Sequence, residues 1–241
     1  MRELSPFIIS GASDIGFARK CNEDFFAVAH SKCGTAALAV VCDGIGGNPK
    51  GELASRISCQ MLAASFMEQS GFSRPGKAAD FLLDNGSEIN RRLLEKSRKT
   101  GLLRPMCCTM VAAVFTSRKI TVLSTGDSRL YCFGRDDTRI LTRDQVVQLA
   151  SGESAICRAM GLDWEFEPEL LEFDHESGSR YLLATDGMYR SLTVRRMQEL
   201  LGQNKPPQVM ADFLVRTALF EGGGFDNITA VFAAERNWEN R

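Results

Sequence analysis

Four aspartates of this 241-residue chain stand where apolar, strand-like runs begin or end. The run ALAVVC leads into Asp43-Gly44, ITVLSTG into Asp127, and YLLAT into Asp186-Gly187, while Asp226-Asn227 comes directly before ITAVF. One such Asp-Gly or Asp-Asn pair on its own is usually a turn. Four of them point to a shared site, because strand ends at one edge of a sheet are neighbours in space.

Carboxylates that converge in this way must be neutralised. Two anions about 4 Å apart repel each other by ~4 kcal/mol at an effective dielectric constant near 20, and a shared proton or a bound cation relieves that repulsion. The motifs offer carboxylates and backbone carbonyls as ligands, and these hard oxygens suit Mg²⁺, Mn²⁺ or Ca²⁺ rather than zinc or copper. Gly44 fits such a site, because a residue without Cβ lets its carbonyl approach an ion closely.

A second polar cluster lies near the N-terminus and consists of Arg19, Asn22, Glu23 and Asp24. On its own this cluster would most simply be a solvated loop. An arginine beside a metal site has a clear use, however, because its planar guanidinium binds two phosphate oxygens at once.

The elements that must position these residues are strands and helices in mixed order. Strand-like runs cover residues 6–13, 24–30, 35–42, 108–116, 119–126, 129–134, 181–185 and 227–235. Helical spacing of apolar residues covers 51–69 and 77–99, and shorter helices are expected over 194–201 and from Pro206 to about Phe220. Gly86 disfavours the helix expected over 77–99, because glycine has a low helix propensity.

This order of elements predicts the α+β class with hairpin-connected strands. A four-layer α-β-β-α sandwich, with two mainly antiparallel sheets flanked by helices, fits it. The chain contains no internal repeat or low-complexity linker. We therefore expect residues 1–241 to form one domain.

The bulk composition excludes several classes of protein. A net charge of −1 and a sequence pI near 6.2 give no basic field for nucleic acid. The longest apolar run, residues 36–42, is far shorter than the ~20 residues of a membrane helix, and the N-terminus does not have the pattern of a signal peptide. We expect a cytoplasmic protein without membrane or nucleic-acid partners.

Eight cysteines stand at positions 21, 33, 42, 59, 107, 108, 132 and 157 without any C-x-x-C pair. Several lie in apolar runs, where a thiol behaves as a small hydrophobe. Reduced thiols in the core are therefore expected, rather than disulfides or a zinc framework. His30 and His175 are far apart in sequence, so zinc sites and Ser-His-Asp catalysis are poorly supported.

Five segments, in order along the chain, resemble motifs of the metal-dependent protein phosphatases (the PPM, or type 2C-like, family). They are R-x-x-NED at residues 19–24, DGIGG at 43–47 followed by KGELAS, GDSRLY at 126–131, LLATDG at 182–187 and FDNITAV at 225–231. Each segment is a weak signal alone, but their order across residues 14–231 makes the resemblance specific. It implies a serine/threonine phosphatase with two Mn²⁺ or Mg²⁺ ions.

The resemblance also implies roles for the metal ligands. Asp43 would bridge the two ions, and Asp186 and Asp226 would complete one of the two sites. The Gly44 carbonyl would serve the other. A water or hydroxide between the ions would attack the phosphorus of phosphoserine or phosphothreonine directly, in the manner of two-metal hydrolases and without a covalent enzyme intermediate.

The same resemblance assigns the remaining candidates. Glu23 and Asp24 would act on the ions through bound waters. Asp127 matches the aspartate that shares a weaker third metal with the counterpart of Asp186, and Arg19 would hold the phosphate.

The chain departs from the family pattern in several places. Ile45 stands where animal members carry a histidine that is a proposed general acid, Gln145 replaces the histidine of L-T-x-D-H, and M-G-T-T is replaced by MCCT at residues 106–109. The flap segment of residues 144–157 is short, and we expect it to form one short helix or a tight loop. An open metal centre would then discriminate among phosphopeptides by about tenfold at most, or ~1.4 kcal/mol, unless a docking surface elsewhere on the protein selects them.

These observations predict a bacterial phosphatase that acts on proteins phosphorylated by serine/threonine kinases, with a cognate kinase or its substrates as partners. Two alternatives stay open at this stage. One is a phosphatase devoted to a single partner-switching regulator, such as an anti-sigma-factor antagonist. The other is a catalytically silent relative that binds phosphoproteins.

Overall fold

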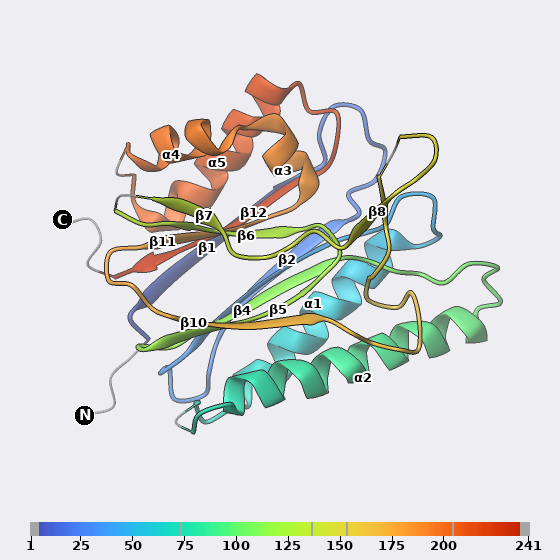
Figure 1. The fold of residues 1–241 in the computed structure, drawn as a ribbon, viewed down its shortest axis with the longest axis horizontal. Helices are drawn as coiled ribbons and strands as arrows, with labels where there is room; N and C mark the ends of the chain where they lie inside the picture. The colour runs from blue at the N-terminus through green and yellow to red at the C-terminus, as the bar shows by residue number, and fades with distance from the viewer. Residues whose placement is uncertain (1–4, 73, 136, 153, 204, 237–241) are drawn as a thin grey trace.

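The computed structural model describes residues 5–72, 74–135, 137–152, 154–203 and 205–236 (Figure 1). Two five-stranded sheets lie face to face, and helices cover the outer face of each. This arrangement confirms the predicted α+β class and the four-layer α-β-β-α sandwich.

The first sheet has the strand order β1-β12-β11-β6-β7, and every neighbouring pair is antiparallel. Its strands are β1 (Phe7–Asp14), β12 (Ile228–Glu235), β11 (Arg180–Ala184), β6 (Arg129–Phe133) and β7 (Thr138–Ile140). Three helices accompany this sheet: α3 (Asp186–Ser191), α4 (Val194–Leu201) and α5 (Pro207–Gly222). The predicted helix over 194–201 is thereby confirmed, and so is the one that begins at the proline pair.

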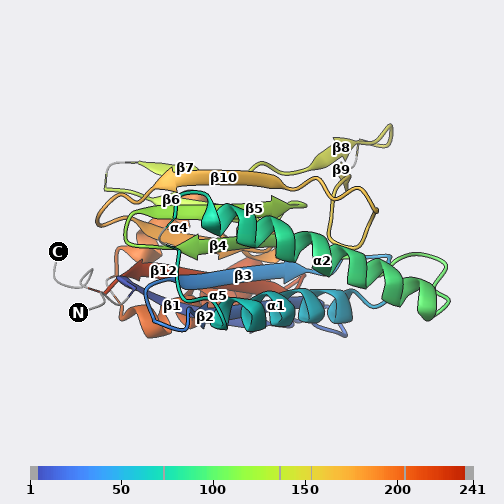
Figure 2. The same cartoon turned by 90° about the horizontal axis from the view of Figure 1, so that it is seen from below.

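The second sheet has the order β10-β5-β4-β3-β2 and is also antiparallel throughout. Its strands are β10 (Glu169–Asp174), β5 (Lys119–Thr125), β4 (Met110–Phe115), β3 (Ala37–Asp43) and β2 (Asp24–His30). Helices α1 (Gly51–Met67) and α2 (Lys77–Lys99) lie across its outer face (Figure 2).

The central strands read as continuous apolar runs because both of their faces are buried. In β3, Leu38 and Val40 belong to the core under the helices, whereas Ala39 and Val41 belong to the core between the sheets. Gly86 does not prevent α2 from forming. A Cβ at this position would lie 2.8 Å from the Phe166 ring, so the glycine lets that ring pack against the helix.

The short flap segment differs from its prediction. It forms a third, two-stranded sheet of β8 (Val146–Gln148) and β9 (Ser154–Ile156), paired in antiparallel fashion, rather than a helix or a tight loop. Two three-residue stretches, VVQ and SAI, flank the predicted turn at Ser151-Gly152. The expectation missed that three residues on each side of a turn are enough for a small ladder.

The thiol prediction is confirmed in part. None of the eight cysteines forms a disulfide, and five of them are buried: Cys42, Cys59, Cys107, Cys108 and Cys132. The expectation of a core position is wrong for Cys21 and Cys157, which are exposed, and Cys33 is intermediate. These three lie outside the long apolar strands, where sequence gives little information about burial.

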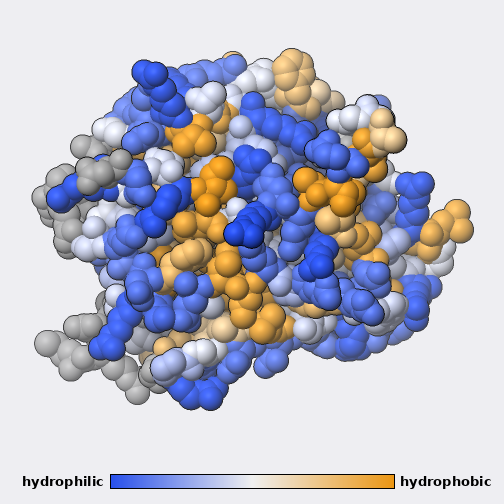
Figure 3. All heavy atoms as spheres, viewed as in Figure 1, coloured by the Kyte–Doolittle hydropathy of each residue, from blue (hydrophilic) through white to orange (hydrophobic). Residues whose placement is uncertain are grey.

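The surface in Figure 3 carries hydrophobic side chains across its middle, with hydrophilic residues around them. Strand β7 forms one edge of the first sheet, and its Ile140 is 47 % exposed.

In the described part of the chain, no helix combines the length and apolar character that crossing a bilayer requires.

Candidate metal centre

A small acidic cavity of about 80 Å³ lies where one end of each sheet meets the other. Its lining includes every predicted site residue except Asp24: Arg19, Glu23, Asp43, Gly44, Asp127, Asp186 and Asp226. Asp43 ends β3 and Asp127 follows β5, both in the second sheet. Asp186 follows β11 and Asp226 precedes β12, both in the first sheet. The two sheets therefore supply two aspartates each.

Strand pairing fixes the position of Asp43. Its backbone N–H donates to the Thr109 hydroxyl at 3.0 Å, and its carbonyl accepts from the Thr109 N–H at 2.8 Å. The next residue, Gly44, donates its N–H to the Glu23 carbonyl at 3.1 Å. A Cβ on Gly44 would come within 2.6 Å of the Gly51 backbone, so only glycine allows α1 to begin this close to the site.

Asn227 joins the N-terminal cluster to the rest of the site. Its side-chain oxygen accepts from the Glu23 N–H at 2.9 Å, and its amide donates to the carbonyls of Ile15 at 2.9 Å and Cys21 at 3.0 Å. In the sequence, Asn227 stands out only as the neighbour of Asp226. Nothing local in the sequence indicates that it holds a loop more than 200 positions away.

Burial and mutual repulsion set the protonation of the acids. The Asp43 carboxyl lies within hydrogen-bond reach of both Asp24 and Asp186. Desolvation, followed by repulsion from these neighbours, raises the pKa of Asp43 well above its usual range. Burial is also the main cause that raises the pKa of Asp127 to about 6 and that raises the pKa of Asp186.

Asp24 lies behind the cavity instead of lining it. It is 4 % exposed and pairs with Asp43 across β2 and β3. The Thr185 hydroxyl donates to its Oδ2 at 2.8 Å, whereas its buried Oδ1 has no hydrogen-bond partner. Burial raises the pKa of this carboxyl to about 7.

Two arginines neutralise the outer aspartates. The guanidinium of Arg19 binds Asp226 in bidentate fashion, with Nε–Oδ1 and Nη2–Oδ2 distances of 2.8 and 2.9 Å. Arg190 Nη1 lies 3.1 Å from Asp186 Oδ2. In this arrangement, no three His, Cys, Asp or Glu side chains among the described residues form a cluster that could hold a metal ion.

The donor set nevertheless fits a divalent cation. Carboxylates with raised pKa values face one cavity, and a buried carboxylate oxygen of Asp24 behind them lacks a partner. All of these donors are hard oxygens, which Mg²⁺ and Mn²⁺ prefer. The acids surround the cavity without closing into a complete ligand cluster.

The flap hairpin is fixed to this site at its base. The Gln145 N–H donates to the Gly126 carbonyl at 2.8 Å, and the Gln145 side-chain oxygen accepts from the Gly126 N–H at 3.1 Å. On the second strand of the hairpin, Ile156 pairs with Val146 at this same base and lines the cavity. Tyr189 of α3 donates to the Asp127 carbonyl at 3.1 Å, so Asp127 is held from both sides.

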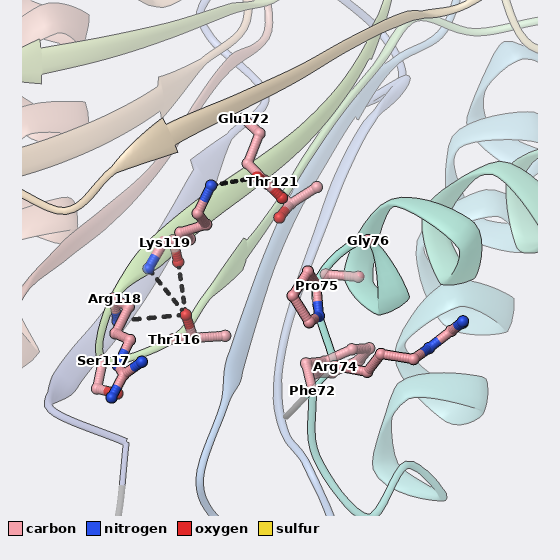
Figure 4. Close-up of a pocket in the computed structure, with 11 residues that line it drawn as sticks. Phe72, Arg74, Pro75, Gly76, Thr116, Ser117, Arg118, Lys119, Thr121 and Glu172 are labelled. Carbon is pink, nitrogen blue, oxygen red and sulfur yellow. Dashed lines mark hydrogen bonds and ion pairs between the residues drawn. The ribbon is translucent and has the colours of Figure 1, made fainter.

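A larger hollow of about 220 Å³ lies away from these acids (Figure 4). The loop between β4 and β5 lines it on one side, with Arg118 and Lys119, and the start of α2 lies on the other, with Gly76. Lys119 is ion-paired to Glu172 at 2.5 Å. This hollow is lined by one acid, Glu172, whereas five acids line the smaller cavity, which is therefore the candidate site.

Comparison with known proteins identifies the family of this chain. The family model described as "Protein phosphatase 2C" matches residues 17–216. The serine/threonine phosphatase Stp of Listeria innocua is 27 % identical over 93 % of this chain and 94 % of its own. The serine/threonine protein phosphatase PstP of Mycobacterium tuberculosis is 29 % identical over 92 % of this chain and 43 % of its own.

Solved structures share the fold. The phosphatase Stp1 of Staphylococcus aureus superposes with a TM-score of 0.86 at 23 % identity, and 97 % of each chain is covered. The catalytic domain of PstP, solved with two manganese ions, gives a TM-score of 0.81 at 27 % identity and covers 95 % of this chain and 97 % of its own. With a family model that spans most of its length, this chain belongs to the protein phosphatase 2C family and is a protein phosphatase.

Proposed function

We propose that this protein hydrolyses phosphoserine and phosphothreonine in other proteins with the help of divalent cations held in the acidic cavity. The observation that carries the proposal is the convergence of strand-end carboxylates from both sheets on one cavity that also includes an arginine. Residues 1–241 would form one such phosphatase domain.

In this proposal Asp43, Asp186, Asp226 and the Gly44 carbonyl hold two Mn²⁺ or Mg²⁺ ions. Asp127 and Asp186 would share a weaker third ion. The raised pKa of Asp43 supports this assignment, because a cation between these carboxylates replaces the proton that they would otherwise share. When bound, such ions supply a hydroxide nucleophile at neutral pH and neutralise phosphate charge.

The protein's own residues bind and orient the substrate. Arg19 is 44 % exposed at its side chain, and its guanidinium presents a planar fork that matches two phosphate oxygens. Its pairing with Asp226 holds it beside the acids before substrate arrives. Glu23 and Asp24 would orient bound water, Asp24 from its buried position behind Asp43. Ile45 and Ile156 add apolar surface to the cavity wall.

We infer a bacterial, cytoplasmic setting. The relatives named above are bacterial proteins, and eight cysteines without a disulfide suit a reducing compartment. Substrates would be phosphoproteins made by a serine/threonine kinase, and a single partner-switching regulator is the narrower alternative.

Phosphate release from a phosphothreonine peptide in the presence of Mn²⁺ tests the proposed function directly. We expect turnover, because Glu23, four aspartates and Arg19 line one cavity. A silent relative that only binds phosphoproteins would retain the peptide and release no phosphate. Comparing the phosphoproteome of a deletion strain with that of its parent would then separate one dedicated regulator from a broad set of substrates.

Replacing Arg19 with alanine should raise KM for a phosphopeptide by about tenfold or more, because a charge-assisted hydrogen bond contributes ~1.5–3 kcal/mol. We expect kcat to change much less, since the contact already exists in the bound ground state. Steady-state kinetics measure both constants. The exposed neighbour Lys20→Ala is the matched control, and an unchanged KM for Arg19→Ala would contradict the phosphate-binding role.

A further inference from the structure

Three exposed phenylalanines lie beside the acidic cavity. The side chains of Phe17, Phe220 and Phe225 are 66, 74 and 77 % exposed. Phe17 comes two residues before Arg19, Phe225 comes directly before Asp226, and Phe220 lies in the last turn of α5. Together with the 40 % exposed Ile15, these residues form what we name the phenylalanine patch.

The patch is built on fixed backbone. The Phe17 and Phe220 rings contact each other, with centroids 6.1 Å apart. The Phe17 N–H donates to the Gly224 carbonyl at 2.7 Å, and the Ala18 N–H donates to the same oxygen at 3.2 Å. A Cβ on Gly224 would lie 2.7 Å from the Phe17 ring, so the missing side chain lets the ring lie against the loop before Asp226.

This gathering is unusual for the described surface. The exposed large aromatic side chains there are Phe17, Phe220, Phe225 and Trp164. Trp164 is partly covered by the Arg98 guanidinium, 4.5 Å from its ring centroid. By contrast, Phe17 and Phe220 contact each other, and Phe225 directly precedes Asp226, the partner of Arg19. Contiguous exposed apolar side chains with a polar rim mark interaction sites, and aromatic residues there often contribute most of the binding energy.

We propose that the phenylalanine patch binds apolar side chains of the phosphoprotein substrate that lie close in sequence to the phosphorylated residue. This inference rests on the proposed function. The patch is continuous with the cavity through Arg19 and Asp226, which hold each other at 2.8 Å. A peptide whose phosphate lies at Arg19 must therefore pass over or beside these rings.

Geometry sets the reach of this contact. An extended peptide advances about 3.3 Å per residue, and only one residue separates Phe17 from Arg19. The selected apolar residue should therefore stand about two to four positions from the phosphorylated one. The patch itself contains no charged side chain, so it selects for apolar character rather than for charge.

The short flap hairpin makes this surface more important. Ile156 is the part of the hairpin that lines the cavity, so the hairpin offers a peptide little wall of its own. Selectivity among phosphopeptides then depends on the part of the rim at Arg19 and Asp226, where the patch lies.

A pair of matched phosphothreonine peptides tests the inference. One has only Gly and Ser around the phosphothreonine, and the other has Phe or Leu at two to four positions on either side. We expect kcat/KM to be about tenfold higher for the apolar peptide, the lower end of what one apolar contact gives. In the double variant Phe17→Ser/Phe220→Ser, the ratio of kcat/KM for the apolar peptide to kcat/KM for the Gly/Ser peptide should fall to about twofold or less. Val209→Ser is the control, because Val209 is a 48 % exposed apolar residue on the same helix.

The outcomes separate this inference from the proposed function. Equal kcat/KM for both peptides in the wild type, with good turnover, overturns the patch and leaves the phosphatase intact. If neither peptide is hydrolysed, the proposed function fails. Fluorescence anisotropy then gives the dissociation constant of each peptide, and the ratio of these two constants tests whether the patch binds apolar side chains. If the double variant Phe17→Ser/Phe220→Ser keeps the wild-type preference for the apolar peptide, the inference is overturned. If that variant also turns a dimer into a monomer in sedimentation, the patch is an interface between copies of this chain.

Discussion

Asp43→Asn should lower kcat by at least about a thousandfold, roughly 4 kcal/mol of transition-state stabilisation, while the fold survives. Asp43 is the acid within hydrogen-bond reach of two others, Asp24 and Asp186, and it lines the cavity from the end of β3. The amide removes a negative charge from the centre of the proposed metal site. Asp226→Asn should lose turnover to a similar degree.

The stability of the same variant gives a second, independent readout. Burial raises the folded-state pKa of Asp43, so in the absence of metal the folded protein keeps this carboxyl protonated where the unfolded chain ionises it, and the resulting cost in stability begins above the ordinary pKa of aspartate and grows with pH until the raised pKa is reached. Asn removes this cost. In chelator at pH 7, the melting temperature of Asp43→Asn should therefore equal or exceed that of the wild type, and Mn²⁺ should no longer raise it.

The exposed helix residue Asp84 supplies the control, since Asp84→Asn changes the same charge far from the cavity. Its turnover and its response to Mn²⁺ should match the wild type. Wild-type turnover by Asp43→Asn would remove Asp43 from the proposed machinery. A melting temperature that falls sharply in chelator would mean that the carboxylate stabilises the metal-free fold.

How well the sequence predicts a feature of this structure depends on how far apart in the chain the interacting residues lie. Strand β3 is readable because seven consecutive residues are apolar until an acid appears, which identifies both the buried strand and its end. The same local pattern appears at Asp127, Asp186 and Asp226, so the ends of strands from both sheets could be placed at one site before any coordinates.

Contacts between distant segments are what the sequence does not contain. Asn227 holds the loop of Cys21 through a carbonyl contact, and Arg19 pairs with Asp226 across 207 positions of the chain. The sequence neighbours of these residues are those of ordinary turn residues and do not indicate the contacts. Asp24 was grouped with Glu23 by sequence adjacency, but the alternation of β2 turns it inward, behind the cavity.

Removal of divalent metal should abolish phosphate release altogether. The cavity offers oxygen donors from Asp43, Asp127, Asp186 and Asp226, and without a cation these acids share protons instead. Dialysis against EDTA, followed by turnover of p-nitrophenyl phosphate or a phosphothreonine peptide, measures the effect. Adding back Mn²⁺ or Mg²⁺ should restore activity, because both ions accept hard oxygen ligands.

Metal binding should also be visible without any substrate. A ligand that binds only the folded state at about 100 times its Kd stabilises that state by ~2.7 kcal/mol. Mn²⁺ should therefore raise the melting temperature of the wild type but not of Asp43→Asn, even where no turnover is measured. Full turnover in excess EDTA, once elemental analysis shows that no metal remains, would contradict the metal-dependent mechanism. Activity lost together with an unchanged melting temperature in Mn²⁺ would instead show that the ion acts on the substrate and not at this cavity.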